Sequence, residues 1–381
     1  MKKADGNVAM QQKGSPSLAG QFLKAYREKK HLTQEQLAED LHVEPRTLRA
    51  WENGERQLAN INELYRIADL LGVEPEQLGL ANSLVIPRTP EQIEEIIDHT
   101  WSLIDQSRLR EARMVIERLA QQVRSQITTE DSHLLRSLAH TYHSAGYVIS
   151  EATQAHESYE AILYYQQMET IARILKDDTL LNIALTYQGD MYRRLGDLGK
   201  AITYLEAARD TTPKADKAAL GNGLQLLARA YVRNGELGNF EYALRQAEAL
   251  AHEIELAISS TRGHYGPGTV YEEYGRSYAD LGQSSKAKEY LDKAKVTLPQ
   301  NEFWGLLILT SRAVALIKGN EIRSGVDLAI EATEKIKQVG ILRYLDRIHL
   351  INQHLENLER QIGTLRKPLQ EALYVNRAID Y

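Results

Sequence analysis

The chain has 381 residues, a length that suggests two or three domains and can bury a core without disulfides. It contains no cysteine, which excludes disulfides, thiolate metal sites and a cysteine nucleophile. With 46 basic and 52 acidic residues the net charge is −6, so no polybasic coat for membrane or nucleic acid is present. No apolar run approaches the ~20 residues of a membrane span, and no apolar segment follows Lys2 and Lys3. We therefore expect a cytoplasmic protein with no membrane partner.

Helix signals dominate the chain, because apolar residues recur at spacings of three and four from Leu18 onward. An all-α fold is predicted. Residues 1–16 are polar and aperiodic, and we expect a disordered tail there. Residues 17–80 form a compact run of five short predicted helices. Residues 81–90 carry two prolines and no helical period, which indicates a linker, and residues 91–381 are long amphipathic helices with short turns.

The segment LTQEQLAEDLHVEPRTLRAWENGER, residues 32–56, predicts two short helices joined by a tight turn. Thr33 and Gln36 make a capping box that begins the first of these helices. Val43 lies in the turn and is expected to be buried. Pro45 lies in the first turn of the following helix, where its missing N–H costs nothing.

This pattern resembles the repressor-type helix-turn-helix domain of phage and bacterial regulators. In that family the third helix of the domain enters the major groove of DNA. The resemblance implies that the following residues contact bases or phosphates: Gln34, Pro45, Arg46, Thr47, Arg49, Ala50, Asn53 and Arg56. Arg46 or Arg49 would bind guanine, while Gln34 would contact phosphate. The resemblance also implies an ion pair between Arg27 and Glu52.

Two features of the first domain weigh against DNA binding. Residues 17–80 hold 8 basic and 11 acidic side chains, and Glu44 places a negative charge directly before Pro45. Because neutralised phosphates supply non-specific affinity, such a domain is expected to bind DNA weakly without its cognate sequence. A second hypothesis therefore stays open, in which the protein is an interaction scaffold whose helix-turn-helix domain does not bind DNA.

The second region repeats a small residue, a tyrosine three positions later and a glycine four positions after that. The four copies are Ala139/Tyr142/Gly146, Gly189/Tyr192/Gly196, Ala228/Tyr231/Gly235 and Gly275/Tyr278/Gly282. After Gly189 and Gly275 the same offsets lead to Ala201/Leu205/Ala208/Pro213 and Ala287/Leu291/Ala294/Pro299. This resembles the tetratricopeptide repeat and implies an α-solenoid of helix pairs, with small residues at each crossing and glycine capping each first helix.

The repeat anchors lie 50, 39 and 47 residues apart, more than the roughly 34 residues of a tetratricopeptide unit. We therefore expect insertions, for example at Glu236–Tyr242 and Ser259–Gly268. Weaker predicted helix pairs flank the clear repeats at Glu91–Gln126 and Asn301–Val339. The tail from Ile341 is predicted to supply a C-terminal capping helix.

First helices of such repeats line a concave face. Their register predicts that an effector contacts Arg136, His140, Asp190, Arg193, Gln225, Arg229, Arg233, Glu272 and Arg276, with His143 and Arg194 on the same face. A face rich in arginine suits a peptide or protein with carboxylates or exposed carbonyls. The alternative is that these arginines pair with neighbouring Asp and Glu.

The two regions together resemble the peptide-sensing, quorum-sensing regulators of Gram-positive bacteria and their phages. That resemblance implies a transcriptional regulator that binds double-stranded DNA as a homodimer and senses a short peptide or protein effector. The sequence offers no support for an enzyme. The stretch Gly263–Thr269 lacks the lysine of a phosphate loop, and His252 has no second histidine four residues on. We expect no cofactor and no metal.

Overall fold

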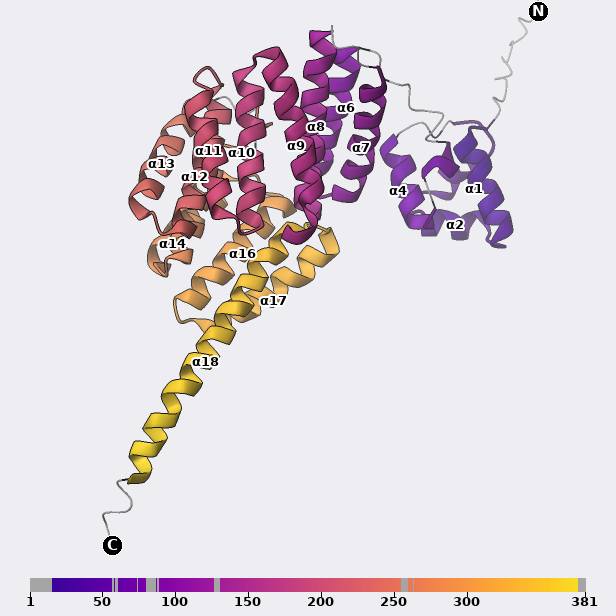
Figure 1. The fold of residues 1–381 in the computed structure, drawn as a ribbon. Coiled ribbons are helices and arrows are strands. Elements are labelled where there is room, and N and C mark those ends of the chain that lie inside the picture. The colour runs from indigo at the N-terminus through magenta and orange to yellow at the C-terminus, as the bar shows by residue number, and fades with distance from the viewer. Residues whose placement is uncertain are drawn as a thin grey trace, which may run out of the picture. The chain divides into compact units, whose positions relative to one another are not determined.

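The computed structural model describes residues 16–375 apart from 57, 59–60, 74, 80–86, 88, 127–130, 255–259 and 263. The chain divides into two compact units, Met1–Ile86 and Pro87–Tyr381. All regular structure in the described residues is helical, which confirms the predicted all-α fold (Figure 1). The predicted tail up to Ser15 and most of the predicted linker lie outside the described residues.

The described residues of the first unit form four α-helices and a 3₁₀ helix. These are α1 (Leu18–Lys29), α2 (Gln34–Asp40), α3 (Pro45–Glu52), α4 (Ile61–Leu71) and η1 (Pro75–Leu78). The fifth predicted helix is therefore a short 3₁₀ helix. One apolar side chain or more from each element is buried in the core: Leu23, Leu37, Leu48, Ile67 and Leu78.

The turn between α2 and α3 forms largely as the sequence predicts. The Thr33 hydroxyl accepts a hydrogen bond from the Gln36 amide at 3.1 Å, and the Gln36 side chain accepts one from the Thr33 amide at 2.8 Å. His42 turns the chain with a positive φ of 53°. The prediction that Val43 is buried is wrong, since it is only half-buried. Its amide bonds the Ala38 carbonyl at 2.9 Å to end α2, which leaves the side chain at the edge of the turn.

The second unit is a stack of helix pairs followed by one long helix. Its elements are α6 (Pro90–Asp105), α7 (Leu109–Gln126), α8 (Ser132–Ala152), η2 (Ala155–Glu157), α9 (Tyr159–Leu175), α10 (Asp178–Arg194), α11 (Leu198–Thr211), α12 (Lys217–Asn234), α13 (Leu237–Ala251), α14 (Pro267–Asp280), α15 (Ser284–Thr297), α16 (Glu302–Lys318), α17 (Ile322–Val339), η4 (Leu342–Tyr344) and α18 (Leu345–Val375). Each even-numbered helix from α6 to α16 packs against the next helix and against its even-numbered neighbours. This arrangement is the predicted tetratricopeptide-like solenoid.

Close helix crossings explain the paired glycines of the two strongest repeats. A Cβ on Gly189 would lie 2.6 Å from Cγ of Leu205, and a Cβ on Gly275 would lie 2.6 Å from Cγ of Leu291. Such contacts cannot be accommodated without separating the helices. The three glycines Gly196, Gly235 and Gly282 have φ between 72° and 86° and follow the ends of their helices, as predicted.

Two details of the predicted repeats are wrong. Gly146 does not cap its helix, because α8 continues to Ala152, and a Cβ on Gly146 would lie 2.7 Å from the Tyr165 ring. A residue without a side chain is needed at position 146 because the Tyr165 ring packs against it. The greater length of α8 accounts for part of the 50-residue spacing between the first two repeat anchors. The segment Glu236–Tyr242 is not an insertion, since Glu236 is the N-cap of α13 and the rest is its first turns.

The chain returns to the solenoid after α17. Tyr344 of η4 is buried, and Ile351 of α18 is 5% exposed where that helix contacts α16 and α17. Beyond this point α18 projects away from the other helices of its unit (Figure 1). Only the first part of α18 therefore acts as the predicted capping helix. Among the described residues, no helix combines the length and apolar character needed to cross a membrane.

Replacing either crossing glycine should destabilise the solenoid. We expect Gly189→Ala or Gly275→Ala to cost about 1–3 kcal/mol in the free energy of unfolding, because the added methyl overpacks the crossing. Gly305 is the matched control: it lies on α16, and a methyl added there would meet nothing within 4 Å, so Gly305→Ala should be neutral or stabilising. Urea unfolding measures all three. If Gly275→Ala and Gly305→Ala changed the free energy of unfolding equally, the close helix packing at Gly275 would be contradicted.

Candidate nucleic-acid interface and effector cavity

The outer face of α3 carries none of the buried residues of that helix. Leu48, Trp51 and Glu52 are the buried residues of this helix. The side chains assigned to base readout lie on the other side, where Arg46 and Arg49 are exposed and Pro45, Thr47 and Ala50 are half-buried. Asn53 and Arg56 are exposed just after the helix. The local helical period therefore leaves this face open to a ligand.

Buried Glu52 organises the inner side of the same face. It is 4% exposed and accepts hydrogen bonds from Arg27 Nε at 2.8 Å and Nη2 at 3.1 Å, which confirms the expected ion pair. The side-chain amide of Gln34 also donates to Glu52 at 2.7 Å. Arg49 is tied only loosely, by a 3.4 Å contact with exposed Glu35. Such a surface pair contributes little and would exchange readily for a phosphate or base.

In the second unit, arginines and carboxylates from successive first helices form a buried charge network. We define it as Glu151, Asp190, Arg193, Arg229, Glu272, Glu273, Arg276 and Arg343, from α8, α10, α12, α14 and η4. Arg193 Nε lies 2.8 Å from Asp190 Oδ1, Arg229 Nε lies 2.8 Å from Glu273 Oε2, and Arg276 Nε lies 3.2 Å from Glu272 Oε1. The four arginines and four carboxylates of the network cancel in charge.

Arg343 joins the C-terminal segment to this network. Its guanidinium contacts Glu151 and lies 3.2 Å from Asp190 Oδ2. The adjacent Tyr344 is 4% exposed. Nearby, Arg194 donates to the Ser150 carbonyl at 2.6 Å and to Asp346 at 3.0 Å. The start of α18 is thus held on the first helices by ion pairs as well as by apolar contact.

The carboxylate of Asp190 is the meeting point of these arginines. It is 1% exposed, and Arg193, Arg229 and Arg343 all lie within ion-pair distance of it. Burial alone would raise the pKa of Asp190, but the charges of Arg193, Arg343 and Arg229 outweigh it and hold that pKa far below its usual value. Asp190 is therefore charged at any physiological pH.

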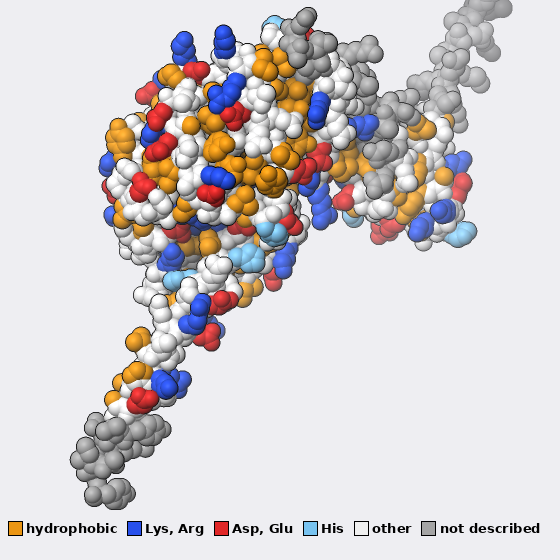
Figure 2. All heavy atoms as spheres, viewed as in Figure 1, with side chains coloured by type: hydrophobic (Ala, Val, Ile, Leu, Met, Phe, Trp, Pro, Cys, Tyr) orange, Lys and Arg blue, Asp and Glu red, His pale blue; other side chains and the backbone are white. Residues whose placement is uncertain are grey.

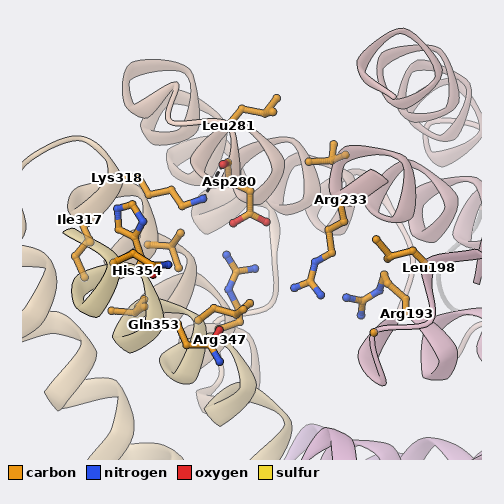
Figure 3. Close-up of a pocket in the computed structure, with 16 residues that line it drawn as sticks. Arg193, Leu198, Arg233, Asp280, Leu281, Ile317, Lys318, Arg347, Gln353 and His354 are labelled. Carbon is orange, nitrogen blue, oxygen red and sulfur yellow. Dashed lines mark hydrogen bonds between the residues drawn. The ribbon is translucent and has the colours of Figure 1, made fainter. Parts of the chain in front are cut away.

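Two adjoining cavities open between the first helices and α18. Their volumes are about 500 Å³ and about 690 Å³. Both are lined by Arg193, Arg233, Asp280, Arg347, Leu350 and Gln353. Figure 3 shows Arg193, Arg233 and Arg347 converging on the open space with Asp280 beside them. We call these adjoining spaces the α18 cavity.

Arg233 and Arg347 are two cations of the α18 cavity that form no ion pair within the described part of the chain. Nε and Nη2 of Arg347 are buried without a hydrogen-bond partner among the described atoms. Burial, with Arg276 nearby, lowers the pKa of Arg347 to about 10. Desolvation also lowers the pKa of Arg233, although Asp280 opposes the shift. Two guanidiniums facing one carboxylate favour an anionic ligand, because an unpaired buried charge is costly.

The predicted effector residues separate into three groups. Arg193, Arg229, Arg233 and Arg276 line the α18 cavity, while Asp190, Gln225 and Glu272 line a smaller space of about 70 Å³ behind it. Arg136 and His140 line neither, because Arg136 pairs with Asp177 and His140 Nδ1 lies 2.7 Å from Glu94. The expectation that His143 faces the groove is wrong, since it is buried between the rings of Trp101 and Tyr187.

The sequence does not indicate the residues from the end of the chain that complete the site. Arg343 and Arg347 lie on η4 and α18, outside any recognised repeat, so no register assigns them to the concave face. Sequence reasoning also misses Glu273, although it follows Glu272 on α14. The spacing of Arg229 and Glu273, 44 residues apart, reflects pairing between successive repeats and carries no local signal.

The first unit matches a known family. Residues 23–78 fit the family model described as helix-turn-helix, which agrees with the sequence motif. The chain therefore contains a helix-turn-helix domain, and this match with the open face of α3 supports a DNA-binding regulator. No curated protein matches the chain. Within the described residues no group of histidines and carboxylates could hold a metal ion.

Several solved structures are similar to the chain at low identity. Bacillus thuringiensis PlcR in complex with the peptide PapR7 and DNA is 17% identical, with a TM-score of 0.40 over 80% of this chain and 99% of PlcR. Apo ComR from Streptococcus vestibularis is 18% identical, with a TM-score of 0.39 over 80% of this chain and 98% of ComR. A putative kinesin light chain repeat protein from Podosopora anserina is 18% identical, with a TM-score of 0.35 over 52% of this chain and 94% of that protein.

Removing the Asp190 carboxylate should strongly destabilise the second unit. Asp190→Asn leaves Arg193 and Arg343 without their shared anion, and we expect a loss of about 3–5 kcal/mol in the free energy of unfolding at pH 7. Because the folded-state pKa of Asp190 is depressed, its contribution is present above the unfolded pKa of about 3.9 and is lost as pH falls below it. The difference in free energy of unfolding between wild type and Asp190→Asn, measured by denaturant unfolding, should therefore become smaller below roughly pH 4. A variant as stable as wild type at pH 7 would contradict the network.

Proposed function

We propose that the protein is a sequence-specific DNA-binding transcriptional regulator whose repeat unit binds a peptide or protein effector, and that it acts as a homodimer. The observation that carries the DNA-binding role is the pair of exposed arginines, Arg46 and Arg49, on the outer face of α3 within a matched helix-turn-helix domain. On this face, Arg46 and Arg49 can bind guanine edges or phosphates, and Thr47 and Ala50 can contact a thymine methyl. The backbone near Asn53 and the side chain of Arg56 would contact phosphate.

We assign Gln34 the phosphate contact that the family resemblance implies, although part of its side-chain amide is already used within the domain. Its side-chain amide already donates to Glu52, and Glu52 is also paired with Arg27. Gln34 therefore has one amide hydrogen left for a phosphate. The pairing also fixes the side chain in place, which favours a positional contact over a base contact.

The effector role rests on the α18 cavity. Arg229 and Arg276 are engaged by Glu273 and Glu272, so binding an effector there would break existing ion pairs. Arg233 and Arg347 offer guanidinium groups at no such cost. We therefore assign the anionic group of the effector, such as a C-terminal or side-chain carboxylate, to Arg233 and Arg347. The remaining volume of the cavity would accommodate a few peptide residues.

A non-DNA-binding scaffold is the second candidate, and the charge of the first domain favours it. Residues 17–80 carry more acidic than basic side chains, and Glu44 lies at the N-cap of α3 without making a cap hydrogen bond. If this candidate is correct, the exposed face of α3 contacts protein instead of DNA.

Arg46 should contribute to base readout. Arg46→Ala is expected to weaken binding to the cognate site by about 1–3 kcal/mol and to relax preference at one base pair, because a bidentate contact to guanine is lost. Gln34→Ala should weaken all sequences about equally. Selection of bound sequences from a random DNA pool, followed by titration, identifies the site and measures both effects.

Arg323→Ala is the control for charge in this experiment, since it removes an exposed arginine from α17 in the repeat unit. It should bind DNA like wild type. No enrichment of any sequence by the wild-type protein would contradict the DNA-binding role and favour the scaffold. A bound site without two-fold symmetry, occupied by one chain, would contradict the dimer.

The paired substitution Arg233→Ala with Arg347→Met should abolish effector binding while leaving the fold intact. Neither side chain has an ion-pair partner among the described residues, so their loss should not lower the free energy of unfolding. Affinity selection from a pool of short peptides with free C-termini, compared with the same peptides amidated, measures the interaction. Wild type should retain peptides whose free carboxylate is required, and the paired variant should not. If both proteins retained the same peptides, the effector would bind at a site other than Arg233 and Arg347.

A further inference from the structure

The projecting part of α18 carries a regular apolar stripe. From buried Ile351 the apolar positions alternate by four and three residues through Leu355, Leu358, Ile362, Leu365, Leu369 and Ala372. A strict seven-residue repeat of this kind is the pattern of a two-stranded coiled coil, where both apolar positions of each heptad face a partner helix. We call residues Leu355, Leu358, Ile362, Leu365 and Leu369 the α18 seam.

The seam becomes exposed as α18 leaves the solenoid. Leu355 and Leu358 are half-buried, whereas Ile362, Leu365 and Leu369 are 63%, 73% and 62% exposed. Figure 2 shows hydrophobic side chains along the projecting helix between charged ones. Elsewhere on the described surface, exposed apolar residues such as Val296 do not continue in a heptad repeat. A contiguous stripe, unlike scattered apolar residues, marks an interaction surface.

The sequence of the projecting helix is poorly suited to remain helical by itself. It contains Gly363 and an internal Pro368, the two residue types least favourable in a helix. In proteins, most of the stability of a helix comes from packing of its apolar face against other elements. Burial of the seam against another helix would supply the missing stability. Within the described residues, the contacts that α18 makes with its own chain lie near its start, with α16, α17 and η4 and, through Asp346, with Arg194 of α10.

The charges beside the seam favour a second copy of this chain as the partner. Glu359 and Arg366 lie seven residues apart and directly follow seam positions Leu358 and Leu365, so they occupy equivalent heptad positions on one flank. In an antiparallel pair, residues at this flanking position face their counterparts. Glu359 then faces Arg366 of the partner subunit, and two-fold symmetry creates the same pair twice. A parallel pair would instead place each of them opposite a neutral glutamine or a histidine.

We propose that the α18 seam forms an antiparallel coiled coil with the same helix of a second copy. This inference rests on the homodimer of the proposed function and specifies its surface. The self-complementary seam buries Ile362, Leu365 and Leu369, and the Glu359–Arg366 pairs select the antiparallel orientation. A two-fold axis crossing α18 joins the two repeat units through their C-terminal helices.

Sedimentation velocity of the full chain over a range of concentrations tests the surface. Leu365→Asp should weaken the dimer by at least roughly 100-fold, because a buried unpaired carboxylate replaces a leucine in the seam. Val296→Asp, at an 85% exposed position on α15, is the matched control and should dimerise like wild type. Both positions are exposed in a single chain, so thermal unfolding of the solenoid should not change in either variant.

Charge reversal tests the orientation. Glu359→Arg and Arg366→Glu should each weaken the dimer roughly 10-fold, and the two together should restore it. A monomeric wild type at all concentrations would overturn both the seam and the proposed homodimer. A dimer that survives Leu365→Asp would overturn the seam and leave the homodimer in place. Single reversals that the double variant does not rescue would overturn the antiparallel pairing.

Discussion

The contact of Arg343 with Glu151 and Asp190 holds the concave side of the repeat unit together. Without Arg343, buried Glu151 of α8 would keep no ion-pair partner among the described residues, and buried Asp190 of α10 would lose one of its three arginines. With it, η4 is seated on the first helices and Tyr344 is buried. The position of α18 follows, because that helix begins at the next residue, Leu345. The α18 cavity exists only because α18 starts there.

The same interaction decides which arginines remain available for a ligand. Network arginines are committed to carboxylates from neighbouring repeats, so they act as structural ions. Arg347 is brought into the cavity by α18 but receives no carboxylate of its own, and Arg233 shares only Asp280 at a distance. Helix α18 carries both proposed functions, since Arg347 near its start faces the α18 cavity and the α18 seam lies further along the same helix. An anion that shifts Arg347 would act on the helix that we propose joins two copies, which gives the two functions a physical route of coupling.

Sequence reasoning succeeds where a residue's role is set by its own helix. The inward Leu48 and outward Arg46 follow from helical period alone, and Gly189 and Gly275 follow from a crossing that each repeat builds in the same way. It fails where the deciding partner is remote. Arg343 lies 153 residues from Asp190 and 192 from Glu151 in the chain, and no pattern near either acid indicates it. The prediction for Gly146 is wrong for a related reason: the residue that requires its small size, Tyr165, belongs to the next helix.

If Arg347 is kept unpaired for an anionic ligand, such a ligand should stabilise the folded protein through this residue, and thermal unfolding with added ligand measures that effect. The probes are a dicarboxylate such as succinate and a short peptide with a free C-terminus, each titrated against wild type and Arg347→Met. A ligand that binds only the folded state raises the unfolding temperature as its concentration rises. We expect a concentration-dependent rise in unfolding temperature for wild type and none for Arg347→Met, with the variant at least as stable as wild type in the absence of probe. Equal responses of the two proteins, or a marked loss of stability in Arg347→Met alone, would contradict it.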